Sequence, residues 1–198
     1  MDFILEIENV LDLSTCKSII DRFENDDRKK RGETQHGLIP SIKFSTDLSL
    51  GDESVIKEWE DVVSLTYSCV LQNISKYIND IVSIHPKEYE CINSVFNKCI
   101  ITPPKIQKTP SGGFYKWHHD GLLNRIVTYI IYLNDVSPEH GGSTDFMFGK
   151  SVQPKAGKMV IFPANFAFIH RGREVKNGSK YIITGFICDI PKSDFITA

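Results

Sequence analysis

The sequence predicts one mainly β domain with helices at its N-terminal end, and three observations support this. Helical periodicity dominates residues 1–90, whereas short apolar segments separated by turn residues fill residues 91–190. The chain has 198 residues, 41% of them hydrophobic and 24% charged, which suits a single domain with its own core. We therefore expect helical support over 1–90 and an antiparallel β sandwich or barrel over 91–190.

Two helical regions are predicted in the first half. Leu13, Cys16, Ile19, Ile20 and Phe23 recur at intervals of three and four residues after a cap at Asp12 or Ser14. A longer helical signal over 52–82 places these apolar residues on one broad face: Val55, Ile56, Trp59, Val62, Val63, Leu71, Ile74, Tyr77, Ile78 and Ile81. The segment between the two, residues 24–51, is polar and mixed in charge, and we expect a long loop or a hairpin there.

Three strands stand out in the second half. Residues 126–133, 158–162 and 181–187 are rich in β-branched and aromatic side chains. Turn residues separate such segments at intervals of about ten residues: Gly112-Gly113, Asn134-Asp135, Gly141-Gly142, Pro154, Gly157, Pro163 and Asn177-Gly178. This spacing is typical of antiparallel β architecture.

Composition argues against several classes of protein. The net charge of −2 offers no basic excess, so we do not expect nucleic acid as a partner. No apolar run approaches the roughly 18 residues of a membrane helix. Asp2 stands where a signal peptide carries Lys or Arg, and the five cysteines form no disulfide or zinc pattern. We expect a cytoplasmic protein with reduced, buried or partly buried thiols.

The residues most suggestive of chemistry lie within 115–121. If this segment is a strand, His118 and Asp120 share one face and His119 points the other way. A metal needs at least a third ligand, and the candidates are His36, His85, His140 and His170, of which His170 follows a β-like stretch. Two histidines and one carboxylate form the usual iron(II) site of oxygenases, although His-x-Asp alone is a weak pattern.

Lys180 is the second informative residue. Strand alternation places Lys180, Ile182, Thr184 and Phe186 on one face, where an ammonium group is costly unless an anion meets it. A dicarboxylate that binds the metal at one end and Lys180 at the other would satisfy both groups, with the Thr184 hydroxyl nearby. The alternative is that Lys180 lies at the strand edge and points to solvent.

Together these features make the chain resemble the 2-oxoglutarate- and iron(II)-dependent dioxygenases, specifically their prolyl 4-hydroxylase branch. The resemblance covers residues 95–190, with a weaker match at Ser45-Thr46-Asp47-Leu48. Its motifs are Tyr115-x-x-His118-x-Asp120, Arg125-x-x-Thr128-x-x-x-Tyr132-Leu133-Asn134, Gly141-Gly142-x-Thr144-x-Phe146, Phe162-Pro163, and His170 followed by Val175, Gly178 and Lys180.

The resemblance implies a double-stranded β-helix, or jelly roll, as the catalytic core, with a metal site and a cosubstrate site. Iron(II) would bind His118, Asp120 and His170. The distal carboxylate of 2-oxoglutarate would meet Lys180. The remaining residues that it implies are Tyr132, Thr128 and Thr184 for 2-oxoglutarate, and Tyr115, Arg125 and Phe186 for a peptide substrate.

The implied reaction is hydroxylation of a C–H bond with Fe(II), 2-oxoglutarate and O2, and with ascorbate as a candidate reductant. The expected substrate is a proline in a protein or peptide, and residues 24–51 are expected to form a mobile cover over the barrel mouth. Thr109, Phe186 and Cys188 depart from the family pattern, which leaves the substrate open. The alternatives are a same-fold oxygenase acting on another residue, a small molecule or nucleic acid, and a jelly-roll binding module without catalysis.

Overall fold

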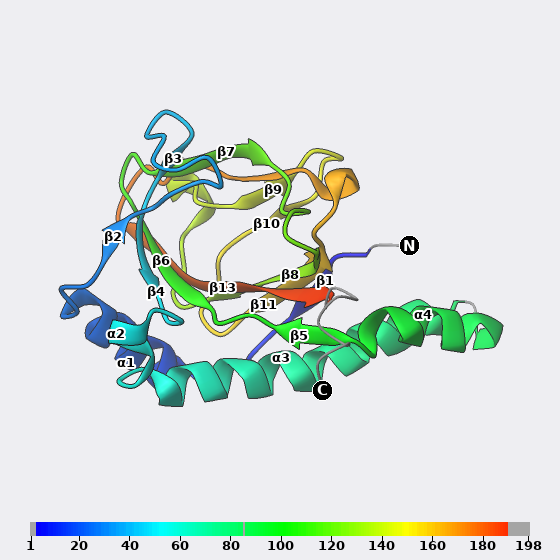
Figure 1. The fold of residues 1–198 in the computed structure, drawn as a ribbon. Helices are drawn as coiled ribbons and strands as arrows, with labels where there is room; N and C mark the ends of the chain where they lie inside the picture. The colour runs from blue at the N-terminus through cyan, green and yellow to red at the C-terminus, as the bar shows by residue number, and fades with distance from the viewer. Residues whose placement is uncertain (1–2, 85, 190–198) are drawn as a thin grey trace.

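The computed structural model describes residues 3–84 and 86–189, and its centre is a pair of antiparallel sheets that face each other (Figure 1). The larger sheet has the order β1 (Leu5–Ile7), β11 (Met159–Pro163), β8 (Arg125–Tyr132), β13 (Ser179–Asp189), β6 (Lys105–Pro110), β4 (Thr46–Ser49) and β2 (Lys30–Arg31), and β5 (Cys99–Ile101) pairs with β13. The smaller sheet has the order β10 (Ser151–Val152), β9 (Thr144–Phe146), β12 (His170–Gly172), β7 (Phe114–His118) and β3 (Lys43–Phe44). This arrangement confirms the predicted jelly-roll class.

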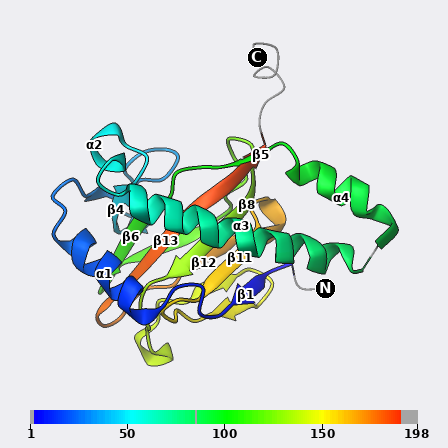
Figure 2. The ribbon, with the colours of Figure 1, turned by 90° about the horizontal axis from the view of Figure 1, so that it is seen from below.

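Helices cover the outer face of the larger sheet. The α-helices are α1 (Leu13–Glu24), α2 (Glu53–Ile56), α3 (Glu60–Val82) and α4 (Tyr89–Phe96), and the short 3-10 helices are η1 (Pro86–Glu88), η2 (Pro138–His140) and η3 (Phe166–Phe168). Figure 2 shows α1 and α3 lying across the strands of that sheet. Within residues 3–84 and 86–189, no helix combines the length and the apolar character needed to cross a membrane.

Strand β8 shows how alternation divides the core. Val127, Tyr129 and Ile131 belong to the apolar cluster that the larger sheet forms with α1 and α3. Ile130 and Tyr132 point the other way and join the cluster between the two sheets, together with Phe146 and Phe162. Thr128 has the same parity as Ile130, so one face of this strand reaches the space between the sheets.

The helical predictions hold with one interruption. Asp12 caps α1 by accepting a hydrogen bond from the Thr15 amide at 2.7 Å. The signal over 52–82 divides into α2 and α3, because Trp59 turns inward and its indole donates to Asp26 at 2.9 Å. Ile56 and Leu71, predicted on the buried face, are exposed.

Of the two structures predicted for residues 24–51, the hairpin is confirmed, because β2 and β4 pair antiparallel, and a purely loop-like segment is excluded. The segment contains β2, β3 and β4, and β4 pairs with β6 inside the larger sheet. The sequence pattern does not reveal β3 and β4, because their residues Lys43 and Asp47 are charged yet buried, with their side chains paired at 2.7 Å. Residues 33–42 remain a connection between strands, and its role as a cover stays a prediction.

The three strands predicted in the second half are confirmed as β8, β11 and β13, to within about two residues at each end. The five cysteines are all free. Cys16, Cys69 and Cys188 are buried, whereas Cys91 is exposed, contrary to the expectation that every thiol is at least partly buried.

Candidate metal centre

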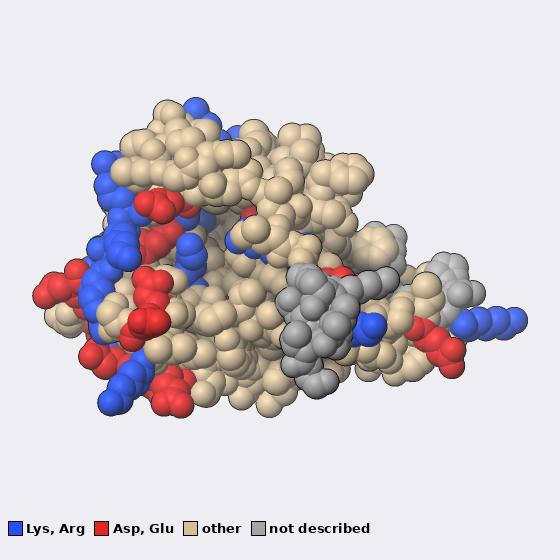
Figure 3. All heavy atoms as spheres, in the orientation of Figure 1, with Lys and Arg blue, Asp and Glu red and all other residues tan. Residues whose placement is uncertain are grey.

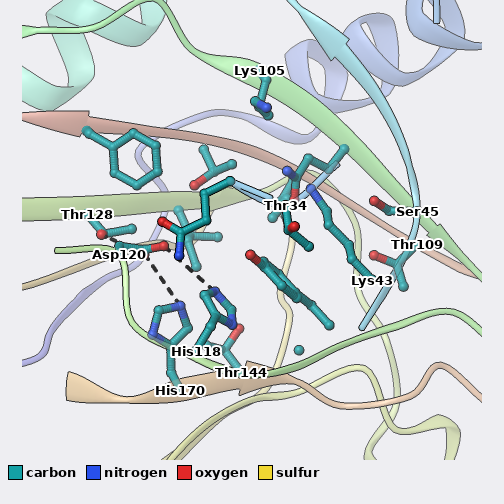
Figure 4. A pocket seen from close by; sticks show the side chains of 18 of the residues that line it. Thr34, Lys43, Ser45, Lys105, Thr109, His118, Asp120, Thr128, Thr144 and His170 are labelled. Carbon is teal, nitrogen blue, oxygen red and sulfur yellow. Dashed lines mark hydrogen bonds and ion pairs between the residues drawn. The ribbon is translucent and has the colours of Figure 1, made fainter. Parts of the chain in front are cut away.

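Three ligand side chains converge at one end of the space between the sheets. One ligand atom from each of His118, Asp120 and His170 lies within 4.8 Å of the other two. His118 ends β7 and His170 begins β12, and these two residues are direct cross-strand partners. The Asp120 carboxylate lies 3.7 Å from His118 Nε2 and 3.5 Å from His170 Nε2 (Figure 4). The strand register therefore brings His170 to the pair His118 and Asp120 that sequence parity indicated, which is the triad that the resemblance implied.

Both imidazoles are fixed by backbone carbonyls. His118 Nδ1 lies 2.8 Å from the Lys116 carbonyl oxygen, and His170 Nδ1 lies 3.0 Å from the Phe168 carbonyl oxygen. Because a carbonyl oxygen only accepts hydrogen bonds, each Nδ1 carries the proton and each Nε2 keeps its lone pair. Both Nε2 atoms point toward Asp120, as a shared metal ion requires.

The third ligand is oriented by Thr128, whose hydroxyl donates to Asp120 Oδ2 at 2.8 Å. Asp120 lies just beyond the end of β7, and its amide donates to the Ala164 carbonyl at 3.0 Å. Burial and the neighbouring His170 lower the pKa of His118 to about 4, which keeps this imidazole neutral at neutral pH. A neutral His, a second imidazole and a carboxylate fit a divalent iron ion.

The other histidines lie elsewhere. His119 is exposed, in agreement with the parity argument. His36 is exposed in the connection between β2 and β3, and His140 lies in η2. His85 falls outside the described residues. Of the three candidates for the third ligand that the structure describes, His170 is the one that lies beside His118 and Asp120.

The triad opens into a cavity of about 520 Å³ between the two sheets, a volume within the usual range for small-ligand sites. Its walls come from both sheets and from residues 33–35, and the exposed lining residues Glu33, Gln35 and Leu123 mark its mouth. The predicted face of β13 lines it with Lys180, Ile182, Thr184 and Phe186. The alternation argument for β13 therefore holds over these four residues.

Lys180 is a buried cation that faces the cavity. Its side chain is 4% exposed, and its ammonium group donates to the Gly142 carbonyl oxygen at 2.9 Å. Within the described part of the chain, no carboxylate lies within ion-pair distance of this group, and burial lowers the pKa of Lys180 to about 8. Solvent exposure, the alternative considered from the sequence, is excluded. The site fits a ligand that brings its own carboxylate, as 2-oxoglutarate does.

The hydroxyl groups near Lys180 differ from the sequence expectation. Tyr132 is fully buried and does not line the cavity, because Thr144 stands in front of it and accepts its hydroxyl hydrogen bond at 2.7 Å. Thr144, which lines the cavity, therefore keeps its own proton free to donate. The Thr184 hydroxyl donates to the Tyr129 carbonyl at 2.9 Å, so its proton is already engaged.

The residues expected to meet a peptide also line the cavity. The Tyr115 ring stacks on His118 with the ring centroids 3.6 Å apart. The Arg125 guanidinium lies 3.7 Å from the centroid of the Phe186 ring. Cys188, which departs from the family pattern, does not line the cavity, and the register of β13 against β8 shifts between Ile187 and Cys188.

Sequence reasoning missed several polar wall residues: Lys43, Ser45, Lys105, Gln107 and Thr144. Lys43 lies in β3 and Ser45 between β3 and β4, within the segment interpreted as a loop or a hairpin. Lys105 and Gln107 lie in β6, which pairs with β4 of that segment. The available signal was the match at Ser45-Thr46-Asp47-Leu48, which indicated a packed segment at that position.

Comparisons with known proteins agree with this geometry. Residues 104–188 match the sequence model of the 2OG-Fe(II) oxygenase superfamily. A prolyl hydroxylase from Trichoplax adhaerens is similar in structure, with a TM-score of 0.74, 17% sequence identity, and coverage of 100% of this chain and 89% of that chain. No curated protein matches the chain by sequence.

Two further solved structures share the fold at low identity. The viral collagen prolyl hydroxylase of Paramecium Bursaria Chlorella virus-1 gives a TM-score of 0.64 and 18% identity, with coverage of 96% of this chain and 97% of that chain. A Pseudomonas putida prolyl-4-hydroxylase gives 0.62 and 15%, with coverage of 95% and 93%. The segment that matches the 2OG-Fe(II) oxygenase superfamily model, residues 104–188, contains the His118, Asp120 and His170 triad, so the catalytic core of this chain is similar to that superfamily in both sequence and site geometry.

Proposed function

We propose that this oxygenase hydroxylates a prolyl residue of a protein or peptide, most simply at C4. The observation that carries the proposal is one cavity that holds both an iron-type triad and the buried cation Lys180. The fold shared with three prolyl hydroxylases supports the choice of substrate class. When bound, iron and 2-oxoglutarate supply oxygen activation and hydroxylation, and 2-oxoglutarate leaves as succinate and CO2.

The protein contributes position and exclusion of water. His118, Asp120 and His170 would hold Fe(II) and leave other coordination positions open. Lys180 would bind the distal carboxylate of 2-oxoglutarate, with Thr144 as a further donor and Tyr132 fixing Thr144 from behind. Thr128 would keep Asp120 in its ligating orientation.

The substrate would enter past the mouth of the cavity. Tyr115, Arg125 and Phe186 would contact the peptide beside the metal ligands, since all three line the cavity. Their aromatic rings and the guanidinium offer apolar and cation–π surfaces to a proline ring and its flanking backbone. This wall also keeps bulk water from the reacting carbon.

The test combines cosubstrate turnover with product analysis. The iron-loaded enzyme is incubated with 2-oxoglutarate, O2, ascorbate and a panel of proline-rich peptides, and succinate and peptide mass are measured. We expect succinate formation and the mass gain of one oxygen atom, located on proline as 4-hydroxyproline by amino-acid analysis.

A matched pair of variants makes the test specific. His118→Ala removes a ligand and should abolish iron binding and succinate formation, whereas His119→Ala removes the adjacent exposed imidazole and should retain both. Succinate without modified peptide would leave the oxygenase in place and reject proline in this panel. Iron retention by His118→Ala would reject the triad.

A further inference from the structure

Two cations that line the cavity, Lys105 and Arg125, have no close carboxylate partner among the described residues. Lys105 comes from β6 and Arg125 begins β8, on either side of β13 in the larger sheet. Among the described residues the side chain of Lys105 makes no hydrogen bond, and its ammonium group lies 4.0 Å from Asp47 Oδ2. Arg125 rests against the Phe186 ring and has no ion-pair partner among those residues. Within the described residues, Arg125 therefore has no ion-pair partner and Lys105 has only this long contact.

Asp47 does not satisfy Lys105, because its oxygens are already engaged. Asp47 Oδ2 accepts from Lys43 at 2.7 Å and from Gln107 at 3.1 Å, and Asp47 Oδ1 accepts from Ser45 at 2.8 Å. Burial lowers the pKa of Lys105, and repulsion from Lys43 and Arg125 lowers it further, against attraction from Asp47 and Glu33. The acidic residues that line the cavity are Glu33 and Asp120. Glu33 is exposed, Asp120 faces the two histidines, and neither forms an ion pair with Lys105 or Arg125 within 4.0 Å in the part of the chain described.

The position of Lys105 distinguishes this pair from the cosubstrate cation. Figure 4 shows Lys105 across the pocket from His118 and His170. Its side chain is 39% exposed, whereas Lys180 is enclosed in the wall. In Figure 3 Lys and Arg side chains border the hollow on this face of the molecule. An anion held by Lys105 and Arg125 would therefore belong to a molecule entering from solvent, at a distance from the metal.

We propose that Lys105 and Arg125 bind a carboxylate of the substrate, namely an Asp or Glu side chain that flanks the hydroxylated residue in a polypeptide. The inference deepens the proposed function and rests on it. Lys105 and Arg125 line one cavity and repel each other, and a carboxylate bound by both would offset that repulsion, with the planar guanidinium able to make a bidentate contact. A small free acid offers the same chemistry, so the experiment must separate the two sources.

The experiment measures peptide binding apart from turnover. The enzyme is loaded with Mn²⁺ and 2-oxoglutarate, and fluorescein-labelled peptide pools with one central proline are titrated by anisotropy. One pool has Asp and Glu among its flanking positions, and a second has Asn and Gln in their place. Lys105→Glu and Lys105→Met are compared with Lys57→Glu, which changes the charge of an exposed lysine outside the cavity. Succinate formation without peptide reports separately on the metal and cosubstrate sites.

We expect the acidic pool to bind about three- to tenfold more tightly than the amide pool, as one partly exposed ion-pair site allows. Lys105→Met should remove this preference, Lys105→Glu should reverse it, and Lys57→Glu should keep it. Equal binding of the pools, or no binding of either, overturns the inference. Competition by free N-acetylaspartate at the same concentration as the peptide also overturns the inference, because Lys105 and Arg125 would then form a site for small free acids. Failure of the proposed function would appear instead as peptide that binds the enzyme but gains no oxygen atom on proline when Fe(II), 2-oxoglutarate and O2 are supplied.

Discussion

The ammonium group of Lys180 is enclosed in the cavity wall with a backbone carbonyl as its hydrogen-bond partner. Burial lowers its pKa to about 8, so it is mostly protonated at neutral pH. A bound carboxylate stabilises the protonated form and raises the pKa in the complex. Binding of 2-oxoglutarate should therefore depend on pH in the range where free Lys180 loses its proton.

The Kd for 2-oxoglutarate should increase at alkaline pH. Below about pH 8 the free enzyme already carries the charge, and the Kd for 2-oxoglutarate should be flat. Above it, binding must take up a proton, so Kd should rise about tenfold per pH unit until the pKa of the complex is reached. Titrations of the metal-loaded enzyme at neutral and alkaline pH measure this.

Two variants control the assignment. The arginine of Lys180→Arg stays charged at every pH tested, so the Kd of this variant for 2-oxoglutarate should not rise with pH. Its affinity for 2-oxoglutarate should be lower than that of the parent, because the guanidinium group is bulkier than the ammonium group. Lys180→Ala should weaken binding roughly thirtyfold or more at neutral pH, the scale of losing one partner of a buried charge pair. A parent profile that stays flat into alkaline pH would exclude Lys180 as the carboxylate partner.

At the scale of elements, β3 and β4 join the two sheets beside the cavity. Lys43 in β3 belongs to the smaller sheet, Asp47 in β4 belongs to the larger one, and their side chains meet at 2.7 Å with 4% and 9% exposure. Removing one partner leaves the other charge buried and uncompensated. This ion pair should therefore stabilise the segment that forms one wall of the site.

We expect Asp47→Ala to lower the free energy of unfolding by about 3 kcal/mol, measured by urea denaturation. The matched control is Asp21→Ala in α1, which breaks an ion pair with Lys17 whose side chains are 59% and 75% exposed. That change should cost less than about 0.5 kcal/mol. Similar effects for the two variants would show that the buried pair contributes little.

The same elements show where sequence reasoning succeeds and fails. Strands β8, β11 and β13 are apolar and β-branched, and both sheet faces are covered, so their composition predicts them. Strands β3 and β4 carry the buried residues Lys43 and Asp47. Because these charged side chains are buried only as an ion pair with each other, a search for hydrophobic periodicity does not detect the two strands. Strand alternation predicted the correct face of β8 for Tyr132. It does not predict how far that side chain lies from the cavity, so the sequence did not show that Thr144 lies between Tyr132 and the cavity.

At the scale of the whole molecule, the site is shared between the sheets. The triad side chains lie at β7 and β12 of the smaller sheet, whereas Lys180 and Thr128 come from the larger sheet. A ligand that spans metal and Lys180 would connect both sheets. Since the unfolded chain offers no such arrangement, metal and 2-oxoglutarate should stabilise the native state jointly.

We expect Mn²⁺ to raise Tm, and 2-oxoglutarate to raise it further only when the metal is present. At a hundredfold excess over Kd the second increment should be about 2.7 kcal/mol, which corresponds to roughly 5–11 °C for a chain of this size. Thermal unfolding by calorimetry, with and without each ligand, measures both steps. Lys180→Ala should keep the metal increment and lose that of 2-oxoglutarate, whereas His118→Ala should lose both and His119→Ala neither. An equal 2-oxoglutarate increment without metal would mean that the cosubstrate binds through Lys180 alone, and the triad would then have no part in holding it.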